Sequence, residues 1–536
     1  QAAIAAMSTI DAPRGLKRDR DGLPVQASDV VPLTLRSLAA SIGAPQGQDA
    51  RGEAVLRRLL TAGMTTEAAV TVRQLFASAA ARLIEESVAL PDAPAKAFWV
   101  PGRIEIAGKH TDYAGGRSLL AATTRGFAVV SVDRGDAMCR IFTVFGHDRS
   151  RREYAELPVA ADLEPQTGHW SAYPAVAIRR LARNFGISLG AEIAVECDLP
   201  ESSGLSTSSA VICYMWMVLA ERNKICESAK FKDHLSIEED LYAYLGFIEN
   251  GQDCGPVLIG DKGIGTFGGS EDHTAIMSCK PCSVNMFSYC PTKREGTFEF
   301  PSDATFVVAV SGAFADKGSG AQADYNNAAF LARDAAAAWC RGSGKLPLGG
   351  KTFVPGSANL AEIIRHVRDE LGGGDHEKVK SVIGEVIAKS DDGKTWGPRA
   401  GDESVRYRAG ALRERFEQFI DESELFVPRI AEALSARDFQ ALGRWSDESH
   451  KQTVERLRNT IPETAWLPQE ARRLGALGAS AFGAGFGGSC WAIVETQAAE
   501  QFAEKWAEAY RDKFPGNAPT STFFVMRPGP GAFCIH

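Results

Sequence analysis

The chain has 536 residues, with 59 Lys and Arg against 67 Asp and Glu, a net charge of −8 at pH 7 and a mean hydropathy of −0.14. This length is too large for one compact core, and the balanced composition excludes wholesale disorder and a membrane-embedded body. The mildly acidic charge argues against nucleic acid as a partner. Eleven cysteines, a sparse and odd number, indicate no disulfide framework, so we expect a cytoplasmic, soluble protein with no membrane contact.

The predicted elements follow one another irregularly along the chain. Residues 1 to about 50 mix charge, Pro and Gly without periodicity, and are expected to form a loosely ordered extension. Apolar spacing predicts helices within 53–86, from about 210, over 324–340 and within 404–458. Apolar runs and alternation predict strands at 98–101, 127–132, 191–199, 306–310 and within 480–494. Because the strands and helices mix without strict strand–helix–strand alternation, the expected fold class is α+β.

A serine-rich loop is the best candidate for a phosphate-binding segment. A predicted strand leads into Gly204-Leu205-Ser206-Thr207-Ser208-Ser209, and an apolar helix follows. Such a loop offers free backbone N–H groups and a helix N-terminus to an anion. The alternative is a serine-rich helix cap that binds no ligand.

Two further segments stand out by their residue types. Residues 475–489 contain glycines that let the backbone approach a ligand or another segment closely; the alternative is a structural turn. Residues 102–113 bring Arg103, Lys109, His110 and Asp112 onto a junction between a strand and a loop. This mixture of charges indicates a polar substrate site, although any one of these charges alone would suit a solvated loop.

Together and in this order, the three segments resemble the three signature motifs of the GHMP small-molecule kinases, and in particular of galactokinases. The first family motif, G-R-x-N-L-I-G-E-H-x-D-Y, is matched at Gly102, Arg103, Gly108, His110, Asp112 and Tyr113. The serine-rich loop resembles the motif P-x-x-x-G-L-S-S-S. Residues 475–489 resemble the C-terminal motif G-x-x-G-S-x-x-T-G-G-G-F-G-G.

The resemblance covers roughly residues 72–536 and implies a two-domain α+β fold with the active site in the cleft between the domains. It implies an N-terminal kinase domain at 66–300 and a C-terminal kinase domain at 301–536. Insertions are expected near 253–266 and at 341–405, a zone rich in Gly, Pro and Lys with one helical passage. Residues 1–65 form an extension for which the resemblance offers no counterpart.

The resemblance also implies a role for individual residues, with ATP and Mg²⁺ as cofactors and a sugar as the substrate. Asp272, in a segment that resembles C-G-I-M-D-Q, is the expected catalytic base, with Arg103 beside it. The expected sugar-binding residues are Lys109, His110, Asp112, Gly269 and Tyr325. The expected nucleotide-binding residues are Gly204, Leu205, Ser206, Thr207, Ser208, Ser209, Gly485 and Gly487. Ser208 and Glu249 are the expected metal ligands, since both offer the hard oxygen atoms that Mg²⁺ prefers.

The implied reaction is transfer of a phosphoryl group from ATP to the anomeric hydroxyl of galactose or a closely related sugar. Asp272 would accept the hydroxyl proton while Arg103 stabilises the developing charge. The sequence departs from the family motif at Glu105, where the motif has asparagine, and at Lys109, where it has glutamate. A cation at position 109 would suit a sugar carboxylate, which leaves a uronic acid 1-kinase as an alternative. Alternatively, Lys109 pairs with Glu105 or Glu271 and does not contact the sugar. A third possible function of the protein is a sugar and ATP sensor with weak catalytic activity.

Overall fold

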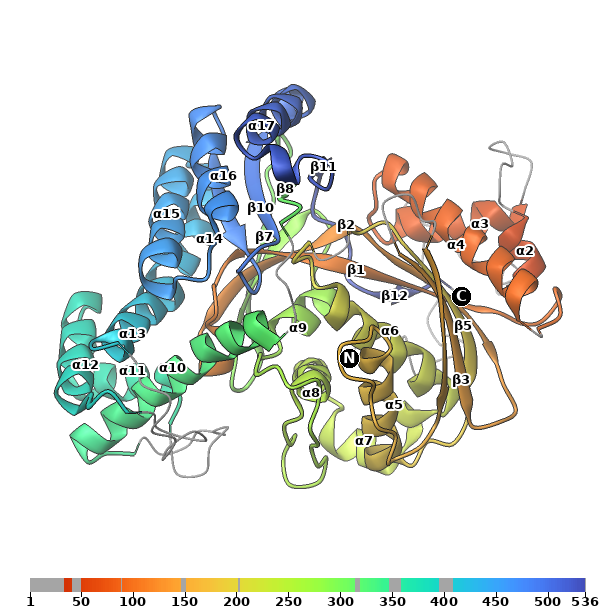
Figure 1. The fold of residues 1–536 in the computed structure, drawn as a ribbon, viewed down its shortest axis with the longest axis horizontal. Coiled ribbons are helices and arrows are strands. Elements are labelled where there is room, and N and C mark those ends of the chain that lie inside the picture. Colours follow the sequence, from red (N-terminus) through yellow and green to blue (C-terminus); the bar gives the residue numbers. More distant parts are fainter. Residues whose placement is uncertain are drawn as a thin grey trace, which may run out of the picture.

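The computed structural model describes residues 33–40, 50–87, 89–145, 151–200, 203–313, 319–346, 358–394 and 408–535, with the backbone alone at 50–53 and 319–324. Two β-sheets of different size organise these residues, and helices cover both (Figure 1). The expected α+β class is therefore confirmed.

The larger sheet has eight strands in the order β12-β1-β2-β5-β3-β4, with β6 paired to β2 and β7 paired to β6. Its strands are β1 Lys96–Ala107, β2 Arg117–Asp133, β3 Met138–Phe145, β4 Arg151–Pro158, β5 Ala191–Cys197, β6 Ser283–Ser288, β7 Lys293–Glu299 and β12 Phe533–Cys534. The strands β1 and β2 run antiparallel, and the loop between them holds the 3₁₀ turn η2 Asp112–Ala114. The pairing of β12 with β1 brings the end of the chain back to the larger sheet.

Helices pack on both faces of this sheet, so its central strands are buried on both sides. Along β1, Phe98 and Val100 belong to one hydrophobic core while Trp99 belongs to the other, as the two-residue period of a strand requires. One face is covered by α2 Leu35–Ala39, α3 Ala50–Thr61 and α4 Thr66–Glu86. The opposite face carries α5 Ala172–Phe185, α6 Thr207–Arg222, η3 Ile225–Glu227, α7 Ala229–His234, α8 Glu238–Asn250 and α9 Glu271–Ser278.

The smaller sheet has four antiparallel strands in the order β11-β8-β10-β9. They are β8 Ala304–Val310, β9 Gly478–Phe482, β10 Ser489–Glu495 and β11 Thr522–Met526. The helices that pack against it are α15 Phe439–Gln452, α16 Pro462–Arg473 and α17 Ala499–Lys513, with the short turns η7 Thr496–Ala498 and η8 Pro515–Asn517 beside α17.

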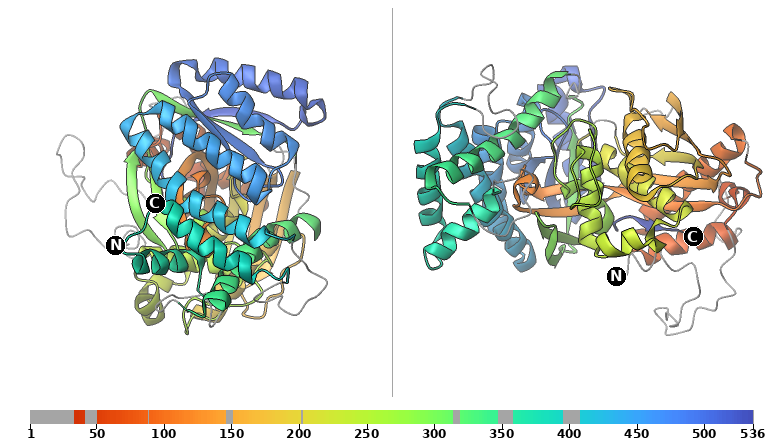
Figure 2. Two further views of the ribbon diagram at one scale, coloured as in Figure 1. Left: turned by 90° about the vertical axis from the view of Figure 1, so that its left-hand side faces the viewer. Right: turned by 90° about the horizontal axis from the view of Figure 1, so that it is seen from below.

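A third group of helices lies at the end of the molecule opposite α2–α4 (Figure 2). It contains α10 Ser319–Ser343, α11 Leu360–Glu370, α12 His376–Ser390 and α13 Ala411–Asp421, which share one hydrophobic core. A π-helical turn, η5 Glu422–Phe426, continues α13 into α14 Val427–Ala436, and a second π-helical turn, η6 Thr453–Leu457, follows α15.

Two differences from the sequence predictions concern particular segments. The expected insertion at 341–405 holds two helices, α11 and α12, where one helical passage was expected, because Gly372 and Gly373 adopt positive φ angles and end the first helix. Part of that insertion and most of residues 1–49 lie outside the described residues. Within the expected N-terminal extension, α2 and α3 pack on α4 and so belong to the layer that covers the larger sheet.

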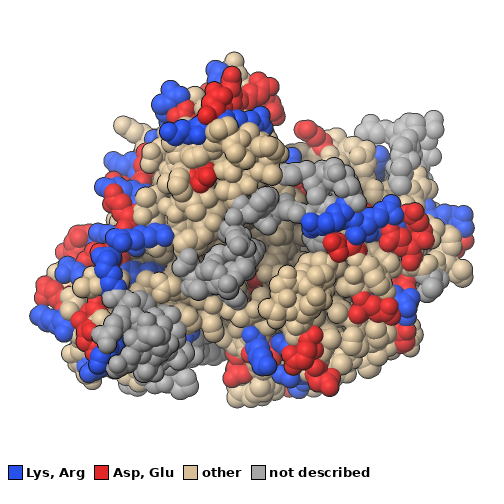
Figure 3. Space-filling model, in the orientation of Figure 1, with Lys and Arg blue, Asp and Glu red and all other residues tan. Residues whose placement is uncertain are grey.

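One face of the molecule is of mixed charge. On the face shown in Figure 3, the basic and acidic side chains of the described residues lie interspersed instead of gathering into a basic stripe. Among the described residues, no helix has both the length and the apolar character needed to cross a bilayer.

Candidate active site

The main candidate site is a cavity of about 130 Å³ where segments from all parts of the chain meet. It is lined by the end of β1 and the loop after it, the start of α6, the end of α8 and the start of α9. Tyr325 of α10 and the loop between β9 and β10 complete the lining. The three sequence motifs, which lie far apart in the chain, therefore share one cavity.

The serine-rich loop enters this cavity as a helix N-terminus. Gly204 and Ser206 adopt positive φ angles of 71° and 61°, which turn the chain directly into α6 at Thr207. Gly204 and residues 206–209 line the cavity, whereas the Leu205 side chain is fully buried in the core. The first N–H groups of α6 and the adjacent hydroxyls form a suitable cradle for an anion.

Asp272 and Arg103 form an ion pair at the cavity wall. Nε of Arg103 donates to Oδ1 of Asp272 over 2.7 Å, and its Nη1 donates to the carbonyl oxygen of Gly204 over 2.6 Å. Burial alone would raise the pKa of Asp272, but the Arg103 charge and the Ser206 hydroxyl hold that pKa below its ordinary value. Asp272 is therefore ionised at neutral pH, next to the helix that begins the anion cradle.

Ser209 connects the serine-rich loop to two carboxylates. Its hydroxyl donates to Oε2 of Glu249 over 2.9 Å and lies 3.4 Å from Oδ2 of Asp272. The Ser208 side chain lines the same cavity, next to the Tyr173 hydroxyl. Of the two predicted serines, Ser209 is the one whose hydroxyl contacts Glu249, the other predicted metal ligand.

Three further carboxylates give the cavity an excess of acidic groups. Burial raises the pKa of Glu105 to about 7 and that of Asp112 to about 6, and it raises the pKa of Glu271 well above its ordinary value. The Asp112 carboxylate is nevertheless well oriented, since it accepts hydrogen bonds from the backbone N–H groups of Tyr113 and Glu271. Sequence reasoning missed Glu271 and His273 as lining residues; both are adjacent to Asp272 in the chain.

The His110 side chain connects two of the motifs. Its Nδ1 lies 2.9 Å from the Tyr113 hydroxyl and its Nε2 lies 3.1 Å from the carbonyl oxygen of Ala484. Because burial lowers the pKa of His110 to about 4, the ring is neutral. The Tyr325 ring lies 5.5 Å from the His110 ring, between centroids, and the two rings form one wall of the cavity.

Glycines allow the close approach of backbone segments at two places. A side chain at Gly269 would overlap the Asp112 carboxylate, so this position must be glycine for Asp112 to reach the start of α9. In the loop between β9 and β10, Gly483 donates its N–H to Oε2 of Glu105 over 2.9 Å. Gly483 and Ala484 line the cavity, whereas the lining does not include the predicted residues Gly485 and Gly487.

The Lys109 side chain, predicted to bind the sugar, contacts other residues of the protein instead. Its Nζ donates to the Ser449 hydroxyl over 2.9 Å and lies 3.7 Å from Oε1 of Glu422. The Lys109 side chain is 1% exposed, and it is not part of the cavity lining formed by the described residues. The pairing expected as the structural alternative therefore exists, but Glu422, more than 300 residues away, takes the place of Glu105 or Glu271.

Comparison with known protein families identifies three matching regions. The model described as GHMP kinases N terminal domain matches residues 172–258, and the model described as GHMP kinases C terminal matches residues 430–512. The model described as galactokinase galactose-binding signature matches residues 91–131, which include Arg103 and Asp112.

Individual relatives match over most of their length. A galactokinase from Roseiflexus sp. (strain RS-1) is 24% identical over 439 residues, which cover 80% of this chain and 90% of the relative. A galactokinase from Exiguobacterium sibiricum is 25% identical over 449 residues, covering 81% of this chain and 93% of the relative. The crystal structure of Lactococcus lactis galactokinase complexed with galactose shares the fold, with a TM-score of 0.61 at 21% identity over 82% of this chain and 95% of that chain.

Proposed function

We propose that this chain, which belongs to the GHMP kinase family, is a galactokinase-like sugar kinase that transfers the terminal phosphoryl group of ATP to the anomeric hydroxyl of galactose or a closely related sugar. The observation that carries the proposal is the ion pair of Arg103 and Asp272 beside the anion cradle of α6. Arg103 lies within the galactose-binding signature, so a sugar held by that signature would meet a nucleotide held by α6 at this pair.

The residues of this cavity suit an in-line phosphoryl transfer. The sugar hydroxyl would give its proton to the Asp272 carboxylate as its oxygen forms the new bond to the terminal phosphorus. The bond from that phosphorus to the leaving oxygen of ADP would break at the same time. Arg103 and the N–H groups at the start of α6 would stabilise the negative charge that spreads over the transferred group.

The oxygen atoms of Ser209 and Glu249 fit a magnesium ion. A hydroxyl and a carboxylate that lie 2.9 Å apart are hard oxygen donors, and Mg²⁺ is commonly held by one or two protein groups together with waters and phosphate oxygens. When bound, the ion would neutralise charge on the β- and γ-phosphates. Ser208, the serine predicted from the sequence, would then remain a neighbour that contacts the phosphates.

A neutral sugar is favoured over a uronic acid. The uronate alternative rests on a free cation at position 109, and Lys109 is already engaged with Glu422 and Ser449. Arg103 is the only Lys or Arg among the lining residues that the structure describes, and it is paired with Asp272. The sensor alternative is disfavoured because the base, the arginine and the hard oxygen donors share one cavity.

The test of this proposal is release of ADP across a panel of neutral hexoses and uronates at saturating ATP and Mg²⁺. We expect turnover with galactose or another neutral hexose, and a sugar 1-phosphate as the product by ³¹P NMR. The absence of turnover with every sugar, combined with measurable ATP and sugar binding by calorimetry, would support the sensor instead. Turnover with a uronate alone would restore the carboxylate-binding hypothesis.

A matched pair of serine variants tests the metal assignment. Ser209→Ala should abolish most of the Mg²⁺ dependence of ATP binding, because it removes the hydroxyl at Glu249. Ser208→Ala should retain it, since that hydroxyl contacts Tyr173. Calorimetric titration of ATP with and without Mg²⁺ measures both, and the reverse result would return the ligand role to Ser208.

We place this enzyme in the cytoplasm. All eleven cysteines are free thiols, which is typical of a reducing compartment. Its small-molecule partners would be the sugar and ATP.

A further inference from the structure

The loop that carries His110, Asp112 and Tyr113 into the cavity is held from outside by the helix α13 and the π-helical turn η5. Arg415 of α13 donates to the carbonyl oxygen of His110 and, over 3.1 Å, to the Tyr113 hydroxyl. Gln418, one turn further, donates to the carbonyl oxygen of Lys109 over 3.2 Å. These contacts join the loop to residues about 300 positions later in the chain and add to the hydrogen bonds that Thr111 makes within the loop.

Glu422 holds the start of this loop. Its Oε1 accepts the backbone N–H of Gly108 over 2.8 Å and that of Lys109 over 3.3 Å. The same carboxylate faces the Lys109 ammonium and accepts a hydrogen bond from the Ser449 hydroxyl over 2.9 Å. The Glu422 side chain is 0% exposed, and a buried carboxylate with this many donors has one fixed orientation.

The π-helical geometry explains how consecutive residues reach the same loop. A π-helical turn inserts an extra residue, so neighbouring side chains point closer to one direction than in an α-helix. Glu422 contacts the start of the loop, while the Ser423 hydroxyl accepts the backbone N–H of Arg117 at its end, over 3.1 Å. Glu424 forms an ion pair with the Arg117 side chain. The turn η5 therefore holds both ends of the segment that enters the cavity.

The backbone of this loop needs such support. His110 has a φ angle of 58° and Gly108 one of 115°. A residue other than glycine at positive φ raises the conformational free energy of the backbone. Without external hydrogen bonds the loop would relax toward ordinary angles, and the Asp112 carboxylate would move with it.

We propose that Glu422 is a positioning residue that sets the sugar affinity of this site by fixing the backbone of Gly108 and Lys109, with the Lys109 ammonium and the Ser449 hydroxyl as its buried partners. The inference rests on the proposed function, because it assigns the consequence to sugar binding. It also gives Lys109 a role that requires no contact with the sugar.

The decisive experiment compares two double variants that both remove the buried ion pair. Lys109→Met/Glu422→Gln keeps a side-chain oxygen to accept the two backbone N–H groups. Lys109→Met/Glu422→Leu places a side chain of similar size at position 422 but removes that oxygen. Because both double variants remove the two charges together, neither leaves one buried charge alone, and the two variants carry the same net charge.

The readouts are KM for the sugar, KM for ATP, and hydrogen exchange of the peptide that spans residues 105–116. We expect the glutamine variant to keep the sugar KM within about threefold of wild type. The leucine variant should raise it by about 10- to 100-fold, with KM for ATP nearly unchanged and faster exchange in the peptide. Equal sugar KM values in the two variants would overturn the proposal, whatever their melting temperatures.

Two serines in α15 provide a smaller, independent test. Ser449→Ala removes a partner of both Glu422 and Lys109 and should raise the sugar KM by about three- to tenfold. Ser446→Ala is the control, because that buried hydroxyl donates only to the Leu442 carbonyl of its own helix. Equal effects would mean that Ser449 acts through helix packing and not through the loop. If the wild type phosphorylated no sugar, the proposed function would fail, while the exchange data would still decide whether Glu422 fixes the loop.

Discussion

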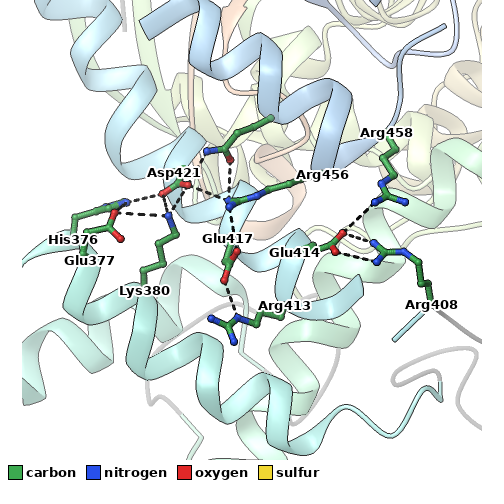
Figure 4. Close-up of polar contacts among 11 residues, drawn as sticks. His376, Glu377, Lys380, Arg408, Arg413, Glu414, Glu417, Asp421, Arg456 and Arg458 are labelled. Carbon is green, nitrogen blue, oxygen red and sulfur yellow. Dashed lines mark hydrogen bonds and ion pairs between the residues drawn. The ribbon is translucent and has the colours of Figure 1, made fainter. Parts of the chain in front are cut away.

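Two regions of this protein surround buried carboxylates in opposite ways. In the cavity, Glu105, Asp112, Glu249, Glu271 and Asp272 outnumber the single lining arginine, and burial raises the pKa of three of them. On the outer side of α13, by contrast, one buried carboxylate is surrounded by donors. Asp421 accepts hydrogen bonds from His376, Lys380 and Gln452, and Arg456 lies 3.3 Å away (Figure 4).

The pKa of Asp421 follows from this surplus of donors. Burial alone would raise it, but the hydrogen bonds from His376, Lys380 and Gln452 hold it below its ordinary value. His376, Glu377 and Asp421 lie close enough together to suggest a metal site, but the Lys380 ammonium already binds both oxygens of Asp421 at 2.8 Å. The difference teaches that a structural cluster satisfies its charges internally, whereas the cavity leaves acidic groups for a ligand or ion to complete.

The largest effect on turnover should come from the same substitution, aspartate to asparagine, made once in the cavity and once in the Asp421 cluster. Asp272→Asn should lower turnover by about 10²- to 10⁴-fold, the usual contribution of a positioned base, while ATP binding persists. Asp421→Asn should leave turnover within about twofold, because Asp421 lies outside the cavity. Steady-state ADP release measures both variants. Near-wild-type turnover in Asp272→Asn would remove the assignment of the base.

The Asp421 cluster should affect the stability of the protein more than its turnover. Asp421→Asn removes the buried carboxylate that Lys380 and Arg456 share and leaves them their ion pairs with Glu377 and Glu417, so we expect the free energy of unfolding to fall by about 2 kcal/mol. The control is Glu432→Gln in the exposed pair of Arg429 and Glu432, where about 0.5 kcal/mol or less is expected. Urea unfolding followed by circular dichroism gives both values. Equal losses would show that the Asp421 cluster is no more than a surface pair.

The pH dependence should differ in sign between the regions. The folded-state pKa of Glu105, about 7, lies above its ordinary value of 4.5. Its contribution to stability is therefore full below pH 4.5 and is lost as the pH rises through about 7. Asp421, with a lowered pKa, contributes stability above its ordinary value of 3.8 that is lost as the pH falls through its folded-state pKa.

Glu105→Gln should accordingly flatten the decline of unfolding free energy between pH 4.5 and about 7, where one proton contributes a slope of at most about 1.4 kcal/mol per pH unit. Glutamine keeps an oxygen to accept the N–H of Gly483, so the hydrogen bond is preserved. Urea titrations at each pH compare the variant with wild type. Parallel pH profiles would mean that Glu105 is ionised in the folded protein.

The smallest effect is expected at the exposed edge of the same network. Arg413 donates to Glu417 over 2.8 Å within one helix, and the Arg413 side chain is about half exposed. Arg413→Ala should change the unfolding free energy by less than about 0.5 kcal/mol and leave turnover unchanged. A larger loss of stability in chemical denaturation would show that the network of Figure 4 is cooperative from its edge to Asp421.

Part of the site could be predicted from the sequence because it depends on short segments. Arg103, Asp112, Asp272 and the serine-rich loop line the cavity as expected, since each belongs to a short motif that can be recognised from its residue types. Gly204 and Gly269 belong to this group, because a turn at positive φ and a close backbone approach leave a signal in the residue type itself.

The partner of Lys109 could not be found in this way. Glu422 and Ser449 are 313 and 340 positions away, and their side chains meet Lys109 only because η5 and α15 pack beside the loop. The same holds for the contact of Glu249 with Ser209 and not with the adjacent Ser208, because α6 directs the two side chains differently.

The sequence by itself therefore determined the fold class and the motifs that meet in the cavity, because periodicity and short motifs are local properties. Only the tertiary structure decided which carboxylate balances which cation. That choice depends on side chains from distant segments and on burial, which raises the pKa of Glu105 to about 7 in the cavity while donors lower that of Asp421 across α13.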